Sequence, residues 1–176
     1  IVYDGTQLAA SVGGAVSTQN VATSPTGTTW TIRTTLSGTY NDITWNGTVL
    51  CCHNNGGGTD KSHTSPDGAT WTERSNAGAA NGSKACWTGV VFCQVATGTA
   101  KCETSPDGTP WTQRTLPSSS NWNDVSYNGT ALCTVGSEGK AATSTNDGAT
   151  WTARTLPNTL INYSAIVSNH RVFGGF

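Results

Sequence analysis

The stretch "TSPDGATWTER" at residues 64–74 decides the fold, because close copies of it return along the chain. The copies are "TSPTGTTWTIR" at 23–33, "TSPDGTPWTQR" at 104–114 and "STNDGATWTAR" at 144–154. The tryptophans of the four copies are separated by 41, 40 and 40 residues, and an arginine follows each of them three positions later. A period of about 40 residues indicates a chain built from repeated supersecondary units.

A second phrase alternates with the first. It reads "IVYDGTQLAA" at 1–10, "ITWNGTVLCC" at 43–52, "ACWTGVVFCQ" at 85–94, "VSYNGTALCT" at 125–134 and "IVSNHRVFGG" at 166–175. Its Asn-Gly pairs at 46–47 and 128–129 predict a two-residue hairpin turn between a strand A and a strand B. The Pro-Asp-Gly sequences at 66–68 and 106–108 predict the turn between strands C and D. No segment has helical periodicity.

These signals predict an all-β fold, a β-propeller of four-stranded blades of about 40 residues. We expect one domain over 1–176, with full blades at 1–42, 43–84, 85–123 and 124–164 and strands A and B of a fifth blade at 165–176. An unfinished blade leaves a strand edge exposed, which proteins generally avoid. We therefore expect either a further C–D hairpin outside these residues or pairing of the edge with another chain.

The fourth copy resembles the Asp-box or BNR repeat, Ser/Thr-x-Asp/Asn-x-Gly-x-Thr-Trp, of sialidase-type β-propellers. The pattern is matched at Ser144, Asn146, Gly148, Thr150 and Trp151. The other copies have Pro25, Pro66 and Pro106 where the pattern has Asp or Asn, and the next residue is Thr26, Asp67 or Asp107. Such copies look most like the degenerate propeller repeats of bacteriophage tail-fibre and other virion proteins, a resemblance that covers nearly the whole chain.

The repeated phrase is expected to build the fold. Asp or Asn can cap backbone N–H groups, Gly permits the turn, and Trp fills the space between blades. The residues expected in this role are Asp67, Gly68, Trp71, Asp107, Gly108, Trp111, Asn146, Gly148 and Trp151. The resemblance implies the same, since Asp-boxes lie away from the sialidase active site.

A binding site is expected on one face. If successive strands alternate in direction, the A–B and C–D turns share one face and the B–C and D–A loops share the other. The B–C loops read "VGGAVSTQN", "CHNNGGGTD", "ATGTA" and "GSEG", and loops that vary on a fixed scaffold are where binding usually resides. The D–A loops supply Tyr40, Asn41, Trp122, Asn123 and Tyr163, and aromatic rings beside amides suit a sugar. The alternative is that the rings fix each loop to the next blade.

The composition excludes several partners. Charged residues make up 11% of the chain and the net charge is −1, which offers no basic surface for nucleic acid. No apolar run approaches the roughly 20 residues of a membrane span. We expect no nucleic-acid partner, no membrane insertion and no cofactor.

The six cysteines are expected to be reduced packing residues. Cys51, Cys93 and Cys133 share one repeat position, which requires a small side chain. The short B–C loop of the third copy is expected to place Cys93 roughly opposite Cys102 on neighbouring strands, and these two are the candidate pair if any disulfide forms. His53 beside Cys51 and Cys52 is the nearest approach to a metal constellation, and we expect a loop histidine there and no metal site.

An enzyme is not expected. A sialidase needs an arginine cluster and a Tyr–Glu pair, whereas here each repeat has one arginine, and none of Glu73, Glu103 and Glu138 is beside a tyrosine. We expect a structural and receptor- or glycan-binding module of a phage virion, such as a tail fibre, assembled in the host cytoplasm. Its partners would be a host-surface glycan or other virion subunits, with homo-oligomerisation open. The alternatives are a secreted extracellular lectin or adhesin, a purely structural spacer, and a sialidase-like glycosidase remnant.

Overall fold

The computed structural model describes residues 1–11, 21–33, 40–54, 61–78 and 82–168, and there the chain forms four antiparallel sheets of four strands. Blade 1 contains β1 (Val2–Tyr3), β2 (Leu8–Ser11), β3 (Val21–Ser24) and β4 (Thr31–Ile32). Blade 2 contains β5 (Tyr40–Trp45), β6 (Leu50–Asn54), β7 (Lys61–Ser65) and β8 (Thr72–Ser75). Blade 3 contains β9 (Gly82–Trp87), β10 (Phe92–Ala96), β11 (Thr99–Ser105) and β12 (Thr112–Ser120). Blade 4 contains β13 (Trp122–Tyr127), β14 (Leu132–Gly136), β15 (Lys140–Ser144) and β16 (Thr152–Thr155).

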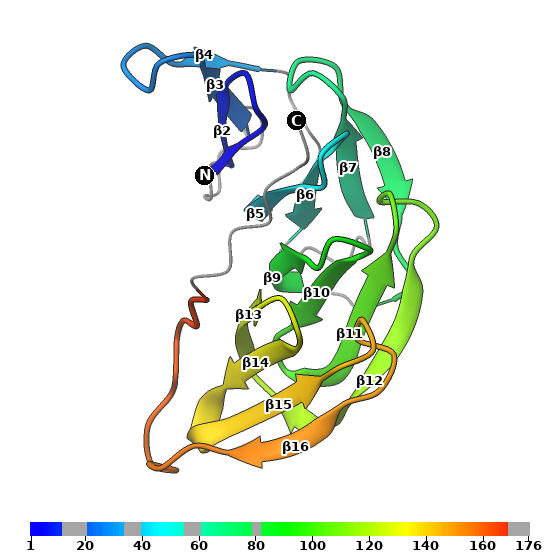
Figure 1. The fold of residues 1–176 in the computed structure, drawn as a ribbon, viewed down its shortest axis with the longest axis vertical. Helices are drawn as coiled ribbons and strands as arrows, with labels where there is room; N and C mark the ends of the chain where they lie inside the picture. The colour runs from blue at the N-terminus through cyan, green and yellow to red at the C-terminus, as the bar shows by residue number, and fades with distance from the viewer. Residues whose placement is uncertain (12–20, 34–39, 55–60, 79–81, 169–176) are drawn as a thin grey trace.

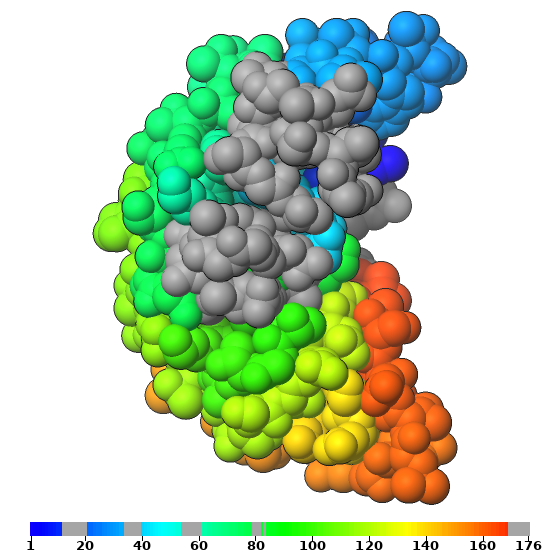
Figure 2. All heavy atoms as spheres, turned by 180° about the vertical axis from the view of Figure 1, so that it is seen from behind, coloured from blue at the N-terminus to red at the C-terminus, as the bar shows by residue number. Residues whose placement is uncertain are grey.

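The four sheets follow one another around an arc, with β5, β9 and β13 on its inner side and β8, β12 and β16 on its outer side (Figure 1). The predicted all-β propeller with four full blades is confirmed. Strand A of blades 2, 3 and 4 begins at Tyr40, Gly82 and Trp122, slightly before the limits expected from the sequence. In the space-filling view the blades form a crescent whose two ends are blade 1, in blue, and the orange residues that follow about 150, while the red residues near 165 lie on its concave side (Figure 2).

Helical structure in the described residues is limited to the three-residue 3-10 turn Ser137–Gly139. No helix in this part of the chain is long and apolar enough to cross a membrane.

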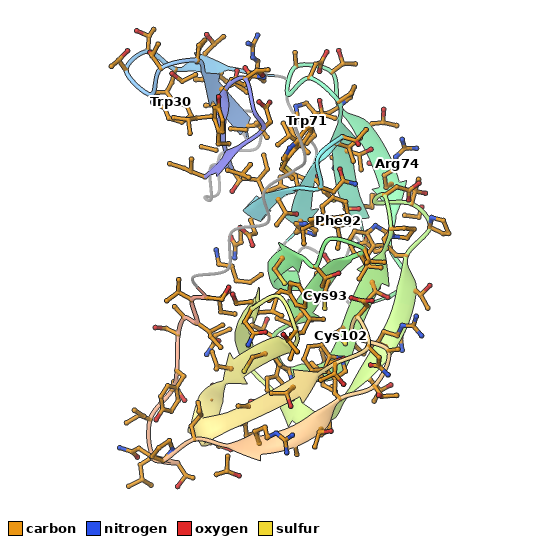
Figure 3. All side chains as sticks on the ribbon, in the orientation of Figure 1. Trp30, Trp71, Arg74, Phe92, Cys93 and Cys102 are labelled. Atoms are coloured by element: carbon orange, nitrogen blue, oxygen red, sulfur yellow. The ribbon has the colours of Figure 1, made fainter. Side chains whose placement is uncertain are left out.

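The hydrophobic core lies between blades. One cluster joins blades 1 and 2 through Ala9, Val21, Tyr40, Ile43, Leu50 and Cys52. A smaller cluster joins blades 2 and 3 through Cys51, Phe92 and Trp111. The largest joins blades 3 and 4 through Cys93, Val95, Cys102, Leu116, Trp122, Val125, Leu132 and Ala142. Each blade is therefore stabilised mainly by its neighbours. Figure 3 shows Trp71 between blades 1 and 2, whereas Trp30 lies at the free end of the arc.

The arginine of each repeat has a structural role. Its Nε donates to the hydroxyl of a threonine on strand C of the same blade, over 2.7, 2.9, 3.2 and 3.1 Å from Arg33 to Thr23, Arg74 to Thr64, Arg114 to Thr104 and Arg154 to Thr143. The bond ties strand D to strand C. It explains why an arginine follows each repeat tryptophan.

The fourth C–D turn is one residue longer than the second. Ser65 Oγ accepts from the Gly68 N–H at 2.8 Å, and Ser144 Oγ accepts from the Gly148 N–H at 3.0 Å, so the two serines are equivalent. Asp67 Oδ1 accepts from the Thr70 N–H at 2.8 Å, and Asn146 Oδ1 accepts from the Thr150 N–H at 3.0 Å. Asp67 and Asn146 therefore play the same part. In the sequence, Asp67 aligns one place later than the Asp or Asn of the Asp-box pattern. The structure shows that the second turn instead lacks one residue between this position and the glycine.

The A–B turn also differs from prediction by one residue. Gly47 (φ 97°) and Thr48 form its centre, because Trp45 pairs with Leu50 and the Asn46 N–H donates to the Val49 carbonyl at 3.3 Å. Asn46 caps this turn by accepting from the N–H groups of Thr48 at 2.9 Å and Val49 at 2.8 Å.

All six cysteines are free, as expected, but the predicted Cys93–Cys102 register is wrong. Cys102 lies opposite Val95, while Cys93 lies opposite Thr104 on β11 and Cys86 on β9. The reason is the tight turn at Thr97–Gly98, where Gly98 has φ 73° and places Val95 and Cys102 across from each other.

Residues 164–168 form no strand, yet they take a place in the propeller pattern. The Ile166 N–H donates to Asp124 Oδ2 at 2.9 Å, just as the Ala85 N–H at the inner strand of blade 3 donates to Asp42 Oδ2 at 2.9 Å. Ile166 thus lies where strand A of a fifth blade is expected. The rest of the predicted fifth blade, from 169 onward, lies outside the described residues.

Candidate functional site

The two predicted faces are present in the structure. On one face, Gln7 Nε2 of an A–B turn donates to the Asp67 carbonyl of the next blade's C–D turn at 2.9 Å. On the other, the Ser137 N–H of a B–C loop donates to the Asn121 carbonyl of a D–A loop at 3.1 Å. We call this second face the loop face. Residues 12–20, 34–39, 55–60 and 79–81, which the sequence predicts to be loops of this face, lie outside the described residues, so the described part of the face belongs mainly to blades 3 and 4.

A depression of about 250 Å³ lies on the loop face between blades 3 and 4. Its lining includes Ser119, Asn121, Ser137, Glu138 and Lys140. Blade 3 supplies Ser119 from the end of β12, and blade 4 supplies Ser137 and Glu138 from the loop between β14 and β15 and Lys140 from the start of β15. The depression therefore depends on two adjacent blades.

The backbone of the blade 4 loop is fixed in an uncommon conformation. Glu138 has φ 58°, the left-handed region that non-glycine residues seldom adopt. Its N–H donates to Asn162 Oδ1 at 3.3 Å, and the Gly139 N–H donates to the Ile161 carbonyl at 3.2 Å. Gly139 is required here, because a Cβ would lie 2.8 Å from the Asn158 carbonyl oxygen. A held backbone of this kind is often found at binding sites.

The lining offers hydrogen bonds in both directions. Glu138 Oε2 lies 3.3 Å from Lys140 Nζ, which also donates to the Ser119 carbonyl at 3.2 Å. The Glu138 side chain is 73% exposed despite this ion pair, so its carboxylate can also accept from a ligand. Ser120 Oγ is buried and has no hydrogen-bond partner among the described residues. The site suits a small polar group, such as the hydroxyls of a sugar.

Two of the predicted binding residues are in the wrong environment. Tyr40 and Trp122 are 0% and 1% exposed, so neither ring can stack on a ligand. The Tyr40 hydroxyl bonds His63 Nδ1 at 2.7 Å, and Trp122 Nε1 donates to the Ser118 carbonyl at 3.2 Å. The expectation of a stacking surface is wrong for these rings. They open strand A of their blades and fill the core between blades, as the alternative stated.

The other predicted residues lie nearer the surface. Asn123 Nδ2 donates to the Tyr163 carbonyl at 2.9 Å, and the Tyr163 N–H donates to the Gly136 carbonyl at 3.3 Å. These two residues are thus brought together beside the loop that carries Glu138. Asn41 is exposed farther along the arc, where its carbonyl accepts from Lys84 Nζ at 3.2 Å.

Most residues that line the depression were not predicted from the sequence to be binding residues. The runs "SSSN" at 118–121 and "SEGK" at 137–140 are polar and lie in a D–A and a B–C connection. Their shared face was predicted, so their proximity could have been inferred. The left-handed Glu138 has no comparable local signal.

A buried polar chain joins blades 2 and 3. Thr44 Oγ1 bonds His53 Nε2 at 2.8 Å, His53 Nδ1 bonds Gln94 Oε1 at 2.8 Å, and Gln94 Nε2 donates to Glu103 Oε2 at 2.7 Å. His53, Gln94 and Glu103 are 0%, 1% and 0% exposed, so the chain of bonds has no access for a ligand. His53 is therefore not the exposed loop residue that the sequence indicated.

No metal site is visible in the described part of the chain, where no three His, Cys, Asp or Glu side chains meet in a metal-binding arrangement. Burial raises the pKa of the Cys51 and Cys52 thiols and lowers the pKa of His53. The thiols are therefore held as neutral packing groups rather than thiolates.

Comparison with known proteins supports the fold. No protein family matches this sequence, and no curated protein matches it. Among solved structures, YCF48 from Cyanidioschyzon merolae is similar with a TM-score of 0.59 and 16% identity over 82% of this chain and 52% of that one. YCF48 bound to D1 peptide gives a TM-score of 0.57 and 15% identity over 76% and 46%. The Niastella koreensis GH74 enzyme gives 0.56 and 22% over 85% and 24%.

These neighbours are β-propeller proteins. The chain spans about half of the two YCF48 chains and a quarter of the GH74 enzyme. At such identities the likeness shows the fold alone.

Proposed function

We propose that this chain is a non-catalytic β-propeller module that binds a glycan through its loop face. The observation that carries the proposal is the depression between blades 3 and 4, where hydroxyl, amide, carboxylate and ammonium groups surround one small space. Sugar hydroxyls both donate and accept hydrogen bonds, and this lining can do the same. Because Tyr40 and Trp122 are buried, their rings take no part in recognition, which rests mainly on hydrogen bonds from this lining.

The placement of charged groups supports a non-catalytic role. The four repeat arginines are each held by a threonine of their own blade and do not form a cluster. Glu73 is exposed on outer strand β8, Glu103 is enclosed between blades 2 and 3, and only Glu138 lies in the depression. Glycoside hydrolysis by two carboxyl groups needs both beside one bond.

A phage virion, in a tail fibre or similar appendage, is the setting we propose for this module. The support is the resemblance of "TSPDGATWTER" at 64–74 and its copies to degenerate repeats of virion proteins. Immunogold labelling of particles purified from the source culture tests this setting, and labelling confined to secreted, particle-free protein would favour a lectin or adhesin.

Glycan binding is tested by screening the chain against immobilised oligosaccharides and measuring the affinity of each hit by calorimetry. Asn121→Ala and Glu138→Gln should each weaken binding about tenfold or more, the usual effect of losing a hydrogen bond to a charged or well-placed group. The matched control is Thr48→Ala, an exposed residue of an A–B turn on the opposite face. Melting temperatures should be unchanged in all three variants.

Three results would contradict the proposal. If Thr48→Ala weakens binding as much as Asn121→Ala, the ligand lies on the opposite face. If no oligosaccharide binds, a spacer role is favoured. Binding of a peptide instead, as for the neighbour bound to D1 peptide, would keep a binding module but exclude the glycan.

A further inference from the structure

Blade 4 has a cavity of about 580 Å³ on the side that faces away from blade 3. Leu132 and Ala142 of this blade pack with Cys93 of blade 3. Cys133 and Thr143 are their neighbours on β14 and β15 and line the cavity on the opposite side of the sheet, since successive side chains on a strand point to opposite faces. Both are half-buried.

The same two positions are covered wherever a further blade follows. A Cβ on Gly68, Gly108 or Gly148 would lie 3.0, 2.5 or 3.0 Å from the Cγ2 of Thr23, Thr64 or Thr104 of the preceding blade. Such a Cβ on Gly108 or Gly148 would also lie 3.7 or 3.4 Å from the sulfur of Cys51 or Cys93. Thr143 and Cys133 of blade 4 are equivalent to these threonines and cysteines. In the other blades the space over them is filled by the C–D turn of the next blade, so the cavity lies where such a turn would pack.

Burial follows this pattern. Cys51 and Cys93 are 0% exposed, and Thr64 and Thr104 are 5% and 4% exposed. A tryptophan three residues after the glycine also packs toward the preceding blade, as Trp111 does by donating from Nε1 to Ser62 Oγ at 3.0 Å. The turns at Gly68, Gly108 and Gly148 therefore show what fits against a preceding blade, a glycine followed three residues later by a tryptophan.

The rim of the cavity repeats two further contacts. Asn46 Nδ2 donates to the Pro106 carbonyl of the next blade's C–D turn at 3.5 Å, and its equivalent Asn128 lines the cavity. Ile166–Ser168 form another wall and lie at the inner-strand position of a following blade, held by Asp124 and by the Ser126 hydroxyl, 3.1 Å from that of Ser168.

We propose that this cavity is the docking site for the C–D turn of a further blade of the same repeat, a β-hairpin with the pattern Ser-x-x-Gly-x-x-Trp. The hairpin completes the blade whose inner strand Ile166–Ser168 begin. Blade 1 of a second copy offers a comparable turn at Gly27, but its strand β1 would need the place that Ile166–Ser168 occupy. The hairpin that joins this segment is therefore the occupant that fits.

The test appends a copy of residues 88–120 directly after Ser168, because Ile166 is equivalent to Ala85 and Ser168 to Trp87. Alkylation of Cys133 is followed by peptide mass spectrometry in the 176-residue chain and in the extended chain. Docking should slow the alkylation of Cys133 at least tenfold and raise the melting temperature. The control is Thr143→Tyr in the extended chain, which fills the cavity without altering the appended hairpin and should abolish the gain in melting temperature.

Equal alkylation of Cys133 in the two chains, with no gain in melting temperature, would overturn the proposal. The same holds if Thr143→Tyr leaves the gain intact. A second copy would be the occupant instead if the 176-residue chain protects Cys133 more at high concentration, forms dimers by sedimentation, and loses both properties on Gly27→Val.

Discussion

Replacing Trp111 should test most directly whether the repeat tryptophans stabilise the packing between blades. Its ring is 6% exposed and packs between blades 2 and 3 with Phe92 and Cys51, and it lies 5.7 Å from the His53 ring in an edge-to-face arrangement. Trp111→Ala leaves a cavity worth about 3–5 kcal/mol. Loss of the donor to Ser62 Oγ adds about 1 kcal/mol. This interface has the smallest of the three hydrophobic clusters, so other contacts are poorly placed to compensate.

The measurement is urea denaturation followed by far-UV circular dichroism. Trp111→Phe is the first control: it keeps most of the packing, loses the Ser62 bond, and should cost about 1–2 kcal/mol. Trp30→Ala is the matched repeat control, because among the described residues Trp30 belongs to no core cluster and its indole donates to the Gly27 carbonyl of its own turn, at 3.1 Å. It should cost about 1 kcal/mol or less. Equal destabilisation by Trp30→Ala and Trp111→Ala would refute packing between blades as the role of the repeat.

Two more predictions concern pH and glycine. Burial lowers the pKa of His53 and His63, so both are neutral in the fold while the unfolded chain binds protons from about pH 6.5 downward. The free energy of unfolding should therefore fall as the pH drops below 6.5, and His53→Gln should reduce that slope in urea titrations between pH 5 and 7. Gly108→Val should destabilise the fold by at least about 1–2 kcal/mol more than Gly89→Val. Both positions have positive φ (87° and 95°), but of the two only Gly108 has a neighbour that a Cβ would meet, Thr64 Cγ2 at 2.5 Å. Equal shifts in melting temperature for the two variants would exclude the close approach between blades.

Much of the fold could be predicted because its signals are local. The glycines at the A–B and C–D turns, such as Gly47 and Gly68, take positive φ as their turns require, and they place the strands without knowledge of the whole molecule. The repeat period then supplies the blades.

What could not be predicted depends on contacts between blades or on a shift of one residue. Tyr40 and Trp122 look like loop residues in sequence, and only packing against the neighbouring blade shows that they are enclosed. The register of Cys93 and the extra residue in the fourth C–D turn each depend on the length of a turn. The residues that flank these turns are similar in type, so the sequence does not show where a turn is one residue longer or shorter.

The buried chain from His53 through Gln94 to Glu103 bears on whether the blades are interchangeable. Their turns are near copies, so duplication or recombination could exchange one blade for another without disturbing a hairpin. Gln94, however, has Thr134 at the equivalent position of blade 4, and Glu103 has Ala142. Placing blade 4 after blade 2 would leave the His53 ring buried without its amide partner, which costs about 1–3 kcal/mol. The buried hydrogen bonds thus stabilise blade 3 as the neighbour of blade 2, whereas the repeated turn sequences favour no particular order of the blades.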